Sequence, residues 1–386
     1  MRLLFVNANR SLSYGGVERW MIDAAAGLGG RGHDAVLLGR PGTAWLDAAA
    51  TAGLRVRADI HGTWAGRVLR VRTAMRAERP DLVIVKGKKA ARMASWGRAT
   101  GAGGRVVFFL GATHELEPRR WIDRHTWARV DAGMVVAHGA ARWYVERGFG
   151  PATKMHVLWK GVDVDHFDAA RDDAARVRTA LGVRPGTLAI GTVGRLAWQK
   201  GIDDLLDAVR RLRPALPDAR FFVVGGGRDA AAVAAAAAAP DLGGAVTLLG
   251  QRDDVPAVLA AMDIVVQSSR REAMAQTTLE AMTVGRPVVS TTTVGADEAI
   301  EDGVSGVLVP VGDPPALAEA ILGLAGDPAR RAALGAAARD RIVRHFSRAS
   351  MLDRCEAIFE TIRGGSPEDV IRSARRSDVD GRKPMV

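Results

Sequence analysis

Residues 268–282 read SSRREAMAQTTLEAM and follow a short apolar segment that is typical of a buried strand. Two carboxylates, Glu272 and Glu280, lie on either side of a predicted helix start. A helix start has free backbone N–H groups and the positive end of the helix dipole, so it can bind phosphate. Thr277 and Thr278 are expected to satisfy some of those N–H groups. Because carboxylates accept hydrogen bonds from sugar hydroxyls, the stretch predicts a nucleotide-sugar site in a strand–loop–helix unit.

Composition indicates an ordinary soluble protein of more than one domain. The chain has 386 residues, 48% of them hydrophobic and 25% charged, and domains average roughly 150 residues. The single cysteine, Cys355, excludes an intramolecular disulfide and a cysteine metal cluster. The apolar residues 3–6 are too few for a signal peptide, and the alanine tract 230–239 is shorter than the ~20 apolar residues of a membrane span. We therefore expect a cytoplasmic protein.

Charge is concentrated in the first half of the chain. Residues 1–160 hold 26 Lys and Arg against 12 Asp and Glu, whereas the rest holds 28 against 31. A half this basic is expected to face an anionic membrane surface, a lipid-diphosphate acceptor or nucleic acid. Few aromatic residues accompany the arginines, so nucleic acid is not expected. The alternative explanation for much of the excess is that these arginines lie on solvated faces, in place of lysines.

Two basic segments are candidates for contact with a membrane. Residues 64–79 predict a basic amphipathic helix, which could lie on an anionic bilayer; we favour packing of its apolar face on its own sheet. The segment with Arg119, Arg120, Trp121 and Arg124 is the better candidate, because tryptophan beside arginine suits a membrane interface.

Short β-rich segments alternate with helical patterns along almost the whole chain, which predicts parallel sheets covered by helices. Strands are expected at residues 2–7, 35–38, 55–59, 82–85, 106–110, 133–137, 188–192, 221–224, 246–248, 264–266, 287–290 and 306–309. The alternation stops once, between about residues 157 and 189, where a linker is expected. We therefore predict an α/β protein of two Rossmann-like, doubly wound domains. The expected parts are residues 1–165, 166–346, a closing helix at 347–363 and a disordered tail at 364–386.

Polar or glycine-rich loops follow five consecutive strands of the second half, as in a ligand-binding rim. Residues 194–201 (GRLAWQKG) place Arg195 and Lys200 five positions apart. These cations can neutralise a diphosphate by fork-like and point-charge contact. If this loop stood alone, two surface cations would be the favoured explanation. The further segments are at residues 225–228, 250–256, 272–280 and 292–298, and together they favour a ligand site.

These loops resemble motifs of the retaining glycosyltransferases of family 4, which have the GT-B fold. The matching residues are 194–201, the glycine turn at 225–227, Glu272 with Glu280-Ala281-Met282, Gly285-x-Pro287 and Glu301-Asp302-Gly303. In the first half, residues 15–19 (GGVER) are similar to the family's glycine-rich first loop. The resemblance is specific over about residues 185–346 and looser over 1–167.

The resemblance implies an acceptor-binding first domain, a donor-binding second domain, and no metal or cofactor. The residues that it implies for catalysis are Arg195, Lys200, Glu272 and His114. Those that it implies for donor binding are Gly15, Gly16, Gly194, Gly226, Arg252, Ala273, Met274, Ala275, Gln276, Thr277 and Glu280. The two cations would stabilise the leaving diphosphate, and the two glutamates would bind hydroxyls of the sugar and the ribose.

Three positions depart from the family pattern. Residues 273–275 (AMA) stand where Gly-Phe-Gly is frequent, which narrows the sugar pocket, and Lys160 replaces a frequent asparagine at the hinge. Many members carry a histidine directly after the strand that matches residues 106–110, where this chain has Gly111. His114 either takes over that contact with the donor sugar or is a surface histidine.

We therefore expect a retaining, metal-independent glycosyltransferase. It would move a sugar from a nucleotide-diphosphate donor to an acceptor hydroxyl in lipopolysaccharide, exopolysaccharide or glycolipid assembly. Electrostatic help to the leaving group and positioning are expected to supply most of the catalysis. The charge of the first half predicts an anionic acceptor and peripheral contact with the cytoplasmic membrane. Two alternatives stay open: a nucleotide-sugar epimerase of the same fold, and a nucleotide-sugar-binding protein without turnover.

Overall fold

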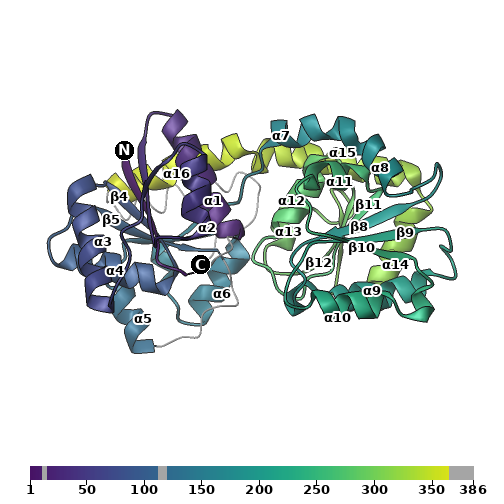
Figure 1. The fold of residues 1–386 in the computed structure, drawn as a ribbon, viewed down its shortest axis with the longest axis horizontal. Helices are drawn as coiled ribbons and strands as arrows, with labels where there is room; N and C mark the ends of the chain where they lie inside the picture. Colours follow the sequence, from purple (N-terminus) through teal and green to yellow (C-terminus); the bar gives the residue numbers. More distant parts are fainter. Residues whose placement is uncertain (11–14, 112–119, 365–386) are drawn as a thin grey trace. The chain divides into compact units, whose positions relative to one another are not determined.

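The computed structural model of the chain describes residues 1–10, 15–111 and 120–364, with the side chains of 120–123 left out (Figure 1). The chain forms two compact units. The first consists of Met1–Trp159 together with the residues from Met351 onward, and the second is Lys160–Ser350. Each unit has its own parallel sheet with helices against it, which confirms the predicted fold class.

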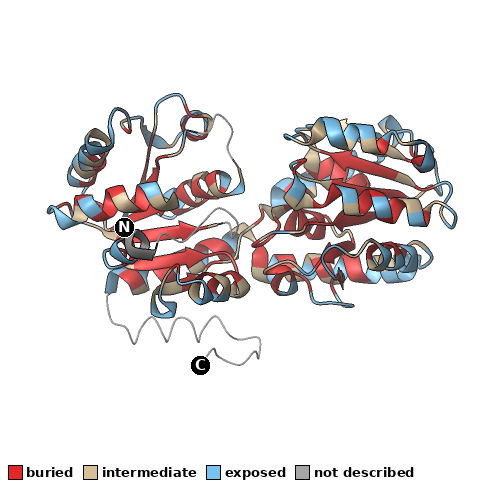
Figure 2. Cartoon of the chain, turned by 90° about the horizontal axis from the view of Figure 1, so that it is seen from below, coloured by how far each residue is buried: buried red, intermediate tan, exposed pale blue. Residues whose placement is uncertain are grey.

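The first unit is built on a seven-stranded parallel sheet of order β3-β2-β1-β4-β5-β6-β7. Its strands are β1 (Arg2–Asn7), β2 (Asp34–Gly39), β3 (Arg55–Arg57), β4 (Leu82–Lys86), β5 (Arg105–Leu110), β6 (Ala132–Val135) and β7 (Met155–Val157). Its helices are α1 (Gly16–Gly30), α2 (Ala44–Thr51), α3 (Trp64–Glu78), α4 (Gly87–Ala99), α5 (Arg120–Trp127) and α6 (His138–Glu146), with the short η1 (Ala152–Lys154). The central strands are apolar because helices cover both of their faces, and Figure 2 shows them as buried.

The second unit is built on a six-stranded parallel sheet of order β10-β9-β8-β11-β12-β13. Its strands are β8 (Ala189–Val193), β9 (Arg220–Val224), β10 (Val246–Gly250), β11 (Ile264–Gln267), β12 (Val288–Thr291) and β13 (Val307–Val309). Its helices are α7 (Val164–Ala169), α8 (Ala174–Ala180), α9 (Ile202–Leu212), α10 (Ala230–Ala237), α11 (Val255–Ala261), α12 (Gln276–Thr283), α13 (Ala296–Ala299), α14 (Pro314–Ala325) and α15 (Pro328–Arg341). Leu205 of α9 and Ile321 of α14 are buried in one apolar core with Phe221 and Ile264 of the sheet.

Every predicted strand is present, but β7 was not predicted. The expected linker, between about residues 157 and 189, is mostly helical and belongs to the second unit, which starts at Lys160. The basic helix at residues 64–79 packs its apolar side inward as favoured, since Val71, Ala74 and Met75 of α3 are buried. The predicted tail lies outside the described residues except for its first residue, Gly364.

The last helix, α16 (Arg348–Gly364), returns the chain to the first unit. Leu352 packs so closely on Gly27 of α1 that a Cβ at Gly27 would lie 2.5 Å from its Cδ1. Arg31 donates a hydrogen bond to Asp353 at 2.7 Å, and His33 Nε2 lies 2.8 Å from Glu356 Oε1. His33 therefore has a structural role, because its imidazole contacts α16.

Strand order reverses between β1 and β4 in the first sheet and between β8 and β11 in the second. At such a switch point the connections leave the two strands on opposite sides, which opens a crevice at their carboxyl ends where ligands bind. In the described ranges, no helix is both long enough and apolar enough to cross a membrane.

Candidate active site

The loops that follow β8 and β11 are joined at the switch point of the second sheet. The carbonyl oxygen of Gln199 accepts hydrogen bonds from the backbone N–H groups of Arg270 at 2.8 Å and Arg271 at 3.2 Å. Ser268 Oγ donates to the carbonyl oxygen of Lys200 at 3.1 Å. These bonds fix the backbone of two predicted motifs, residues 194–201 and 268–282, against each other.

Two glycines allow the loops to approach this closely. Gly201 has a φ of +58°, and a Cβ there would lie 2.2 Å from the carbonyl oxygen of Ser268. Gly225, after β9, has a φ of +135°, and a Cβ there would lie 1.9 Å from the carbonyl oxygen of Gly194. Other residues are strained at these angles and would also push the loops apart. The glycines of these motifs are therefore required by backbone packing.

Lys200 and Glu272 meet at the junction of the two loops. Lys200 Nζ lies 2.5 Å from Glu272 Oε1, and the two side chains are 16% and 20% exposed. Gly194 leaves room for the lysine, because even a Cβ there would approach Lys200 Cε to 3.3 Å. A phosphate bound by Lys200 and a hydroxyl bound by Glu272 would therefore be neighbouring groups of one ligand.

The start of α12 lies directly after this loop and has no side-chain cap. The residue before the helix is Ala275, which has no capping group. Thr278 Oγ1 is buried without a hydrogen-bond partner among the described residues. The prediction that threonine hydroxyls cap this helix is therefore wrong. Backbone N–H groups at the start of α12 are left for an anionic ligand, as at other helix starts that bind phosphate.

Lys160 holds the loop in place, a role that the sequence did not reveal. Its Nζ donates to the carbonyl oxygen of Met274 at 2.8 Å, and Gln276 Nε2 donates to the carbonyl oxygen of Gly161 at 3.4 Å. Residues 273–275 are buried, with Met274 only 1% exposed. The sequence did contain one indication of this contact, namely a lysine at position 160 where the family frequently has asparagine. A lysine side chain is longer than an asparagine side chain and can reach the Met274 carbonyl oxygen.

The remaining predicted residues of the second unit differ in their exposure and in the partners that they already have. Arg195 is exposed and makes no hydrogen bond or ion pair with another described residue. Arg252 makes two hydrogen bonds to Asp254, at 2.7 and 2.6 Å, which lower the pKa of the Asp254 carboxyl. The carbonyl oxygen of Gly226 accepts from Leu196 N at 2.8 Å, and Glu280 is 8% exposed within α12. Arg195 is thus open to a ligand, whereas the Arg252 guanidinium is already partnered.

Trp198 is a feature of this rim that was not predicted. It is 50% exposed, and the guanidinium groups of Arg270 and Arg271 lie 5.5 and 5.2 Å from its ring centroid. Arg270 also pairs with Asp203 and Asp204 at the start of α9. The contacts hold both arginines beside the loop that carries Glu272.

In the first unit, the predicted glycines lie at the start of α1. Glu18 Oε2 accepts a hydrogen bond from Gly15 N at 3.3 Å, and Glu18 also forms a buried ion pair with Lys86 at the end of β4. Gly16 is the first residue of α1. The start of this helix therefore already has a carboxylate beside it.

The missing family histidine has a steric explanation. A Cβ at Gly111 would lie 2.2 Å from Cγ2 of Val17 in α1, so a side chain there requires Val17 or α1 to move. His114 lies outside the described residues, as does Arg119 of the expected membrane contact, and the side chains of Arg120 and Trp121 are not described either. Arg124 is exposed on α5.

Among the described residues, no three His, Cys, Asp or Glu side chains gather as they would around a metal ion. Metal independence remains a prediction.

Two family models match the chain in consecutive segments. The family described as Glycosyltransferase Family 4 matches residues 14–166, and the one described as Glycosyl transferases group 1 matches residues 187–327. The second segment contains the contact between Lys200 and Glu272.

The amino-acid sequence of the chain is similar to those of known glycosyltransferases. The lipopolysaccharide core biosynthesis glycosyltransferase LpsE of Rhizobium meliloti is 26% identical over 343 residues, 88% of this chain and 94% of that protein. The GDP-mannose-dependent monoacylated alpha-(1-6)-phosphatidylinositol monomannoside mannosyltransferase of Corynebacterium glutamicum is 33% identical over 280 residues, 69% of this chain and 72% of that protein. Both are transferases, which does not favour the epimerase or the binding protein without turnover.

Solved structures share the fold. The structure of HepE from Anabaena in complex with UDP has a TM-score of 0.82 at 22% identity, over 94% of this chain and all of that one. A glycosyltransferase from Rickettsia africae has a TM-score of 0.84 at 19% identity, over 95% and 99%. Because both family models match the chain, and because its fold is shared with these structures, the chain belongs to the family 4, group 1 glycosyltransferases of the GT-B fold.

Proposed function

We propose that this glycosyltransferase moves a sugar from a nucleotide-diphosphate donor to an acceptor hydroxyl, with retention of configuration and without a metal ion. The contact between Lys200 and Glu272, beside the uncapped start of α12, carries the proposal. The donor class is supported by HepE, whose structures contain UDP or UDP-glucose. The name of LpsE assigns it to lipopolysaccharide core biosynthesis, and the mannosyltransferase is named for a phosphatidylinositol mannoside substrate. We therefore propose a role in polysaccharide or glycolipid assembly.

Donor binding exchanges the partners of the ion pair. A phosphate oxygen takes the place of Glu272 next to Lys200 Nζ, and the freed carboxylate accepts a hydrogen bond from a sugar hydroxyl. Glu280 binds the ribose hydroxyls, and the first N–H groups of α12 bind phosphate. The donor is thus held by charges of both signs.

The reaction breaks the bond between the anomeric carbon and the diphosphate oxygen. Negative charge grows on the diphosphate, where Lys200 and Arg195 stabilise it. The acceptor hydroxyl attacks from the face that the diphosphate leaves, and its proton passes to the departing phosphate oxygen. The balance is one glycosidic bond formed, one glycosyl–phosphate bond broken, and one proton moved to the nucleotide diphosphate.

Calorimetric titration with UDP, GDP and ADP tests the donor site. The wild type is expected to bind one of the three, and Lys200→Ala and Glu280→Ala are each expected to weaken that binding about tenfold, since each removes a charge-assisted contact. Arg211→Ala is the matched control, because it removes an exposed cation of α9 outside the site. Absence of binding to all three nucleotides, or equal loss in the control, would refute the donor site.

Retention and metal independence are tested on the reaction itself. NMR of the product should show the same anomeric configuration as in the donor, and EDTA should leave the rate unchanged. An inverted product, or a rate lost with EDTA and restored by a divalent cation, contradicts this part of the proposal.

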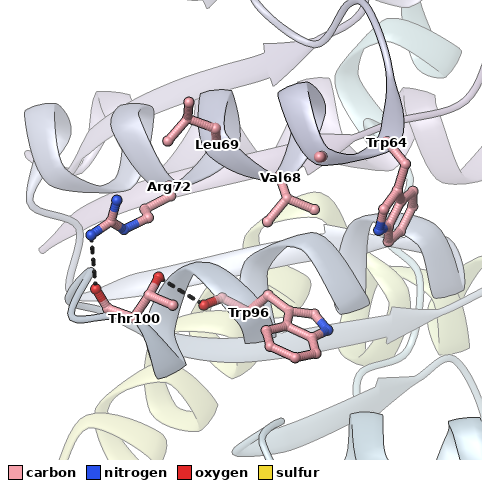
Figure 3. Close-up of a pocket in the computed structure, with 7 residues that line it drawn as sticks. Trp64, Val68, Leu69, Arg72, Trp96 and Thr100 are labelled. Atoms are coloured by element: carbon pink, nitrogen blue, oxygen red, sulfur yellow. Dashed lines mark hydrogen bonds between the residues drawn. The ribbon is translucent and has the colours of Figure 1, made fainter.

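We further propose that the first unit contacts an anionic membrane surface through α3 and α4. These helices form an open cavity of about 410 Å³ lined by Trp64, Ala65, Val68, Leu69, Arg72, Trp96 and Thr100 (Figure 3). Trp64, Leu69 and Trp96 are 41%, 56% and 55% exposed. Arg72 donates to the Thr100 carbonyl oxygen at 3.1 Å, beside this apolar surface. Apolar side chains among arginines suit an anionic interface.

Co-sedimentation with vesicles tests this contact. Leu69→Gln is expected to reduce binding to phosphatidylcholine vesicles that contain phosphatidylglycerol. Leu322→Gln is the control, since Leu322 is 42% exposed in the second unit. Equal binding of both variants and the wild type would contradict the proposed face.

A further inference from the structure

A second cavity lies at the switch point of the first sheet. It measures about 350 Å³ and is lined by Ala8, Asn9, Arg10, Arg40, Arg67 and Lys89. The first three residues follow β1, Arg40 follows β2, Arg67 comes from α3, and Lys89 comes from α4 directly after β4. Because strand order reverses between β1 and β4, this is where a ligand of the first sheet is expected.

The charged side chains that line this cavity are all cationic. Four of its six lining residues are Arg or Lys, and no carboxylate lines it among the described residues. None of the four cations forms an ion pair with a described residue; Arg67 donates only to the backbone oxygen of Thr63, at 3.3 Å. Burial, together with the charges of Arg10 and Arg67, lowers the pKa of the Arg40 guanidinium. An anionic ligand would relieve this repulsion.

Other arginines of the same unit have carboxylate partners. Arg55 pairs with Asp34 and Glu78, and Arg57 pairs with Asp59 and Glu78. The absence of such partners is therefore a property of the cavity and not of the arginine-rich unit as a whole.

The number and kind of the cations indicate the ligand. A carboxylate carries one charge, whereas a phosphate monoester carries up to two and offers three oxygens. Guanidinium groups bind phosphate through paired hydrogen bonds. A cavity of this volume falls in the range of small-molecule sites, about 300–1,000 Å³, so it can hold a phosphate and part of the group attached to it.

We propose that the cavity formed by Asn9, Arg10, Arg40, Arg67 and Lys89 binds a phosphate group of the acceptor. The identification of that ligand as the acceptor rests on the proposed sugar transfer. The phosphate can belong to a soluble molecule or to a lipid headgroup, and both present the same chemistry to the four cations. Asn9 supplies a neutral polar group beside them for a hydroxyl near the phosphate.

Glycerol 3-phosphate and phosphatidic acid present this monoester in soluble and lipid form. In the soluble arm, calorimetry compares glycerol 3-phosphate with glycerol. In the lipid arm, co-sedimentation compares phosphatidylcholine vesicles with and without phosphatidic acid. We expect binding of the phosphorylated probe in at least one arm and no binding of glycerol.

The variants separate this cavity from the rest of the molecule. Arg67→Gln and Arg40→Gln are each expected to weaken binding of the phosphorylated probe about tenfold, through loss of a charge-assisted contact. Arg70→Gln is the matched control, because Arg70 is an exposed cation of the same helix that does not line the cavity. Thermal unfolding of each variant checks that it is folded.

Lys200→Ala distinguishes failure of this inference from failure of the proposed function. It should weaken nucleotide binding and leave binding of the phosphorylated probe unchanged, and Arg67→Gln should do the reverse. Binding of neither phosphorylated probe, or equal binding by wild type, Arg67→Gln and Arg70→Gln, overturns the phosphate site. If Arg67→Gln weakens the probe but no nucleotide binds the wild type, the phosphate site stands and the donor site fails.

Discussion

The two sheets have the same kind of switch point, but the charges placed there differ. In the second sheet, Lys200 and Glu272 face each other at 2.5 Å, so a cation and a carboxylate share one site. In the first sheet, four cations line a cavity that has no carboxylate among the described residues. The paired site can exchange its internal partner for a ligand that has both a phosphate and hydroxyls. The unpaired site requires an anionic group in its ligand.

The different charges also affect the free energy of the two ligand-free sites. The ion pair of the second unit gives its lysine a partner of opposite charge before a ligand arrives. The first unit keeps like charges close together, which disfavours the empty state. Ligand binding should therefore stabilise the first unit against unfolding by more than its contacts alone suggest.

The largest expected effect is on turnover. Lys200→Ala should lower kcat about 10²–10³-fold, because it removes a charge that stabilises the leaving group. Arg67→Gln should instead raise the KM of a phosphorylated acceptor about tenfold with little change in kcat. Steady-state kinetics with both substrates varied measures the two effects. If both variants change the same parameter, the two switch points do not have separate roles.

The second-largest effect is expected at acidic pH, which should lower the free energy of unfolding of the first unit. Burial lowers the pKa of His156 in β7 to about 4, below its ordinary value of 6.5. The unfolded chain therefore binds this proton first, and stability is lost as pH falls from about 6.5 to about 4, by up to about 3 kcal/mol. Urea unfolding of the wild type and His156→Gln at pH 6.5 and 4.5 measures it. A pH dependence that is the same in both proteins would contradict this origin.

A smaller effect is expected at Gly111. Gly111→Ala should destabilise the protein by about 1–3 kcal/mol, because the new methyl group would meet Val17 at 2.2 Å. Gly103→Ala is the control, since a Cβ there has no neighbour within 4 Å. Urea unfolding compares them. A Gly111→Ala protein as stable as the control would show that Val17 or α1 moves easily, and a steric clash would no longer explain the absent histidine.

The smallest expected effect is a gain in stability. Arg40→Gln should raise the unfolding free energy of the ligand-free protein by up to about 0.5 kcal/mol, since it removes one of the repelling charges. With glycerol 3-phosphate present the wild type should gain more stability than the variant. Urea unfolding with and without the ligand tests both signs, and a destabilised Arg40→Gln would show that the four cations do not repel one another measurably.

Much of this architecture could be predicted because strand–helix alternation is a local pattern. β7 was missed because its three residues, Met155–Val157, include a histidine and are too few to show a pattern. The return of α16 to the first unit depends on contacts such as Leu352 on Gly27, which join residues more than 300 positions apart. No local pattern reports such a contact.

Two residues of the candidate site could be named from the sequence for the same reason. Both Lys200 and Glu272 could be named because each lies in a recognisable loop after a strand, but their contact depends on the strand order β8-β11. The cationic cavity was not predicted, because its members come from four separate segments. Their sequence signal is diluted in the general excess of arginine.

The route of the chain through α16 sets the order in which the protein can be completed during synthesis. Domains usually fold as units, with the earlier one emerging first. Here the second unit is complete once Ser350 has been made, whereas the first still lacks the residues from Met351 onward. Until then Gly27 has no Leu352 against it, and Arg31 and His33 have no Asp353 and Glu356. A chain that ended near residue 350 would therefore contain the whole second unit, joined to a first unit that lacks α16.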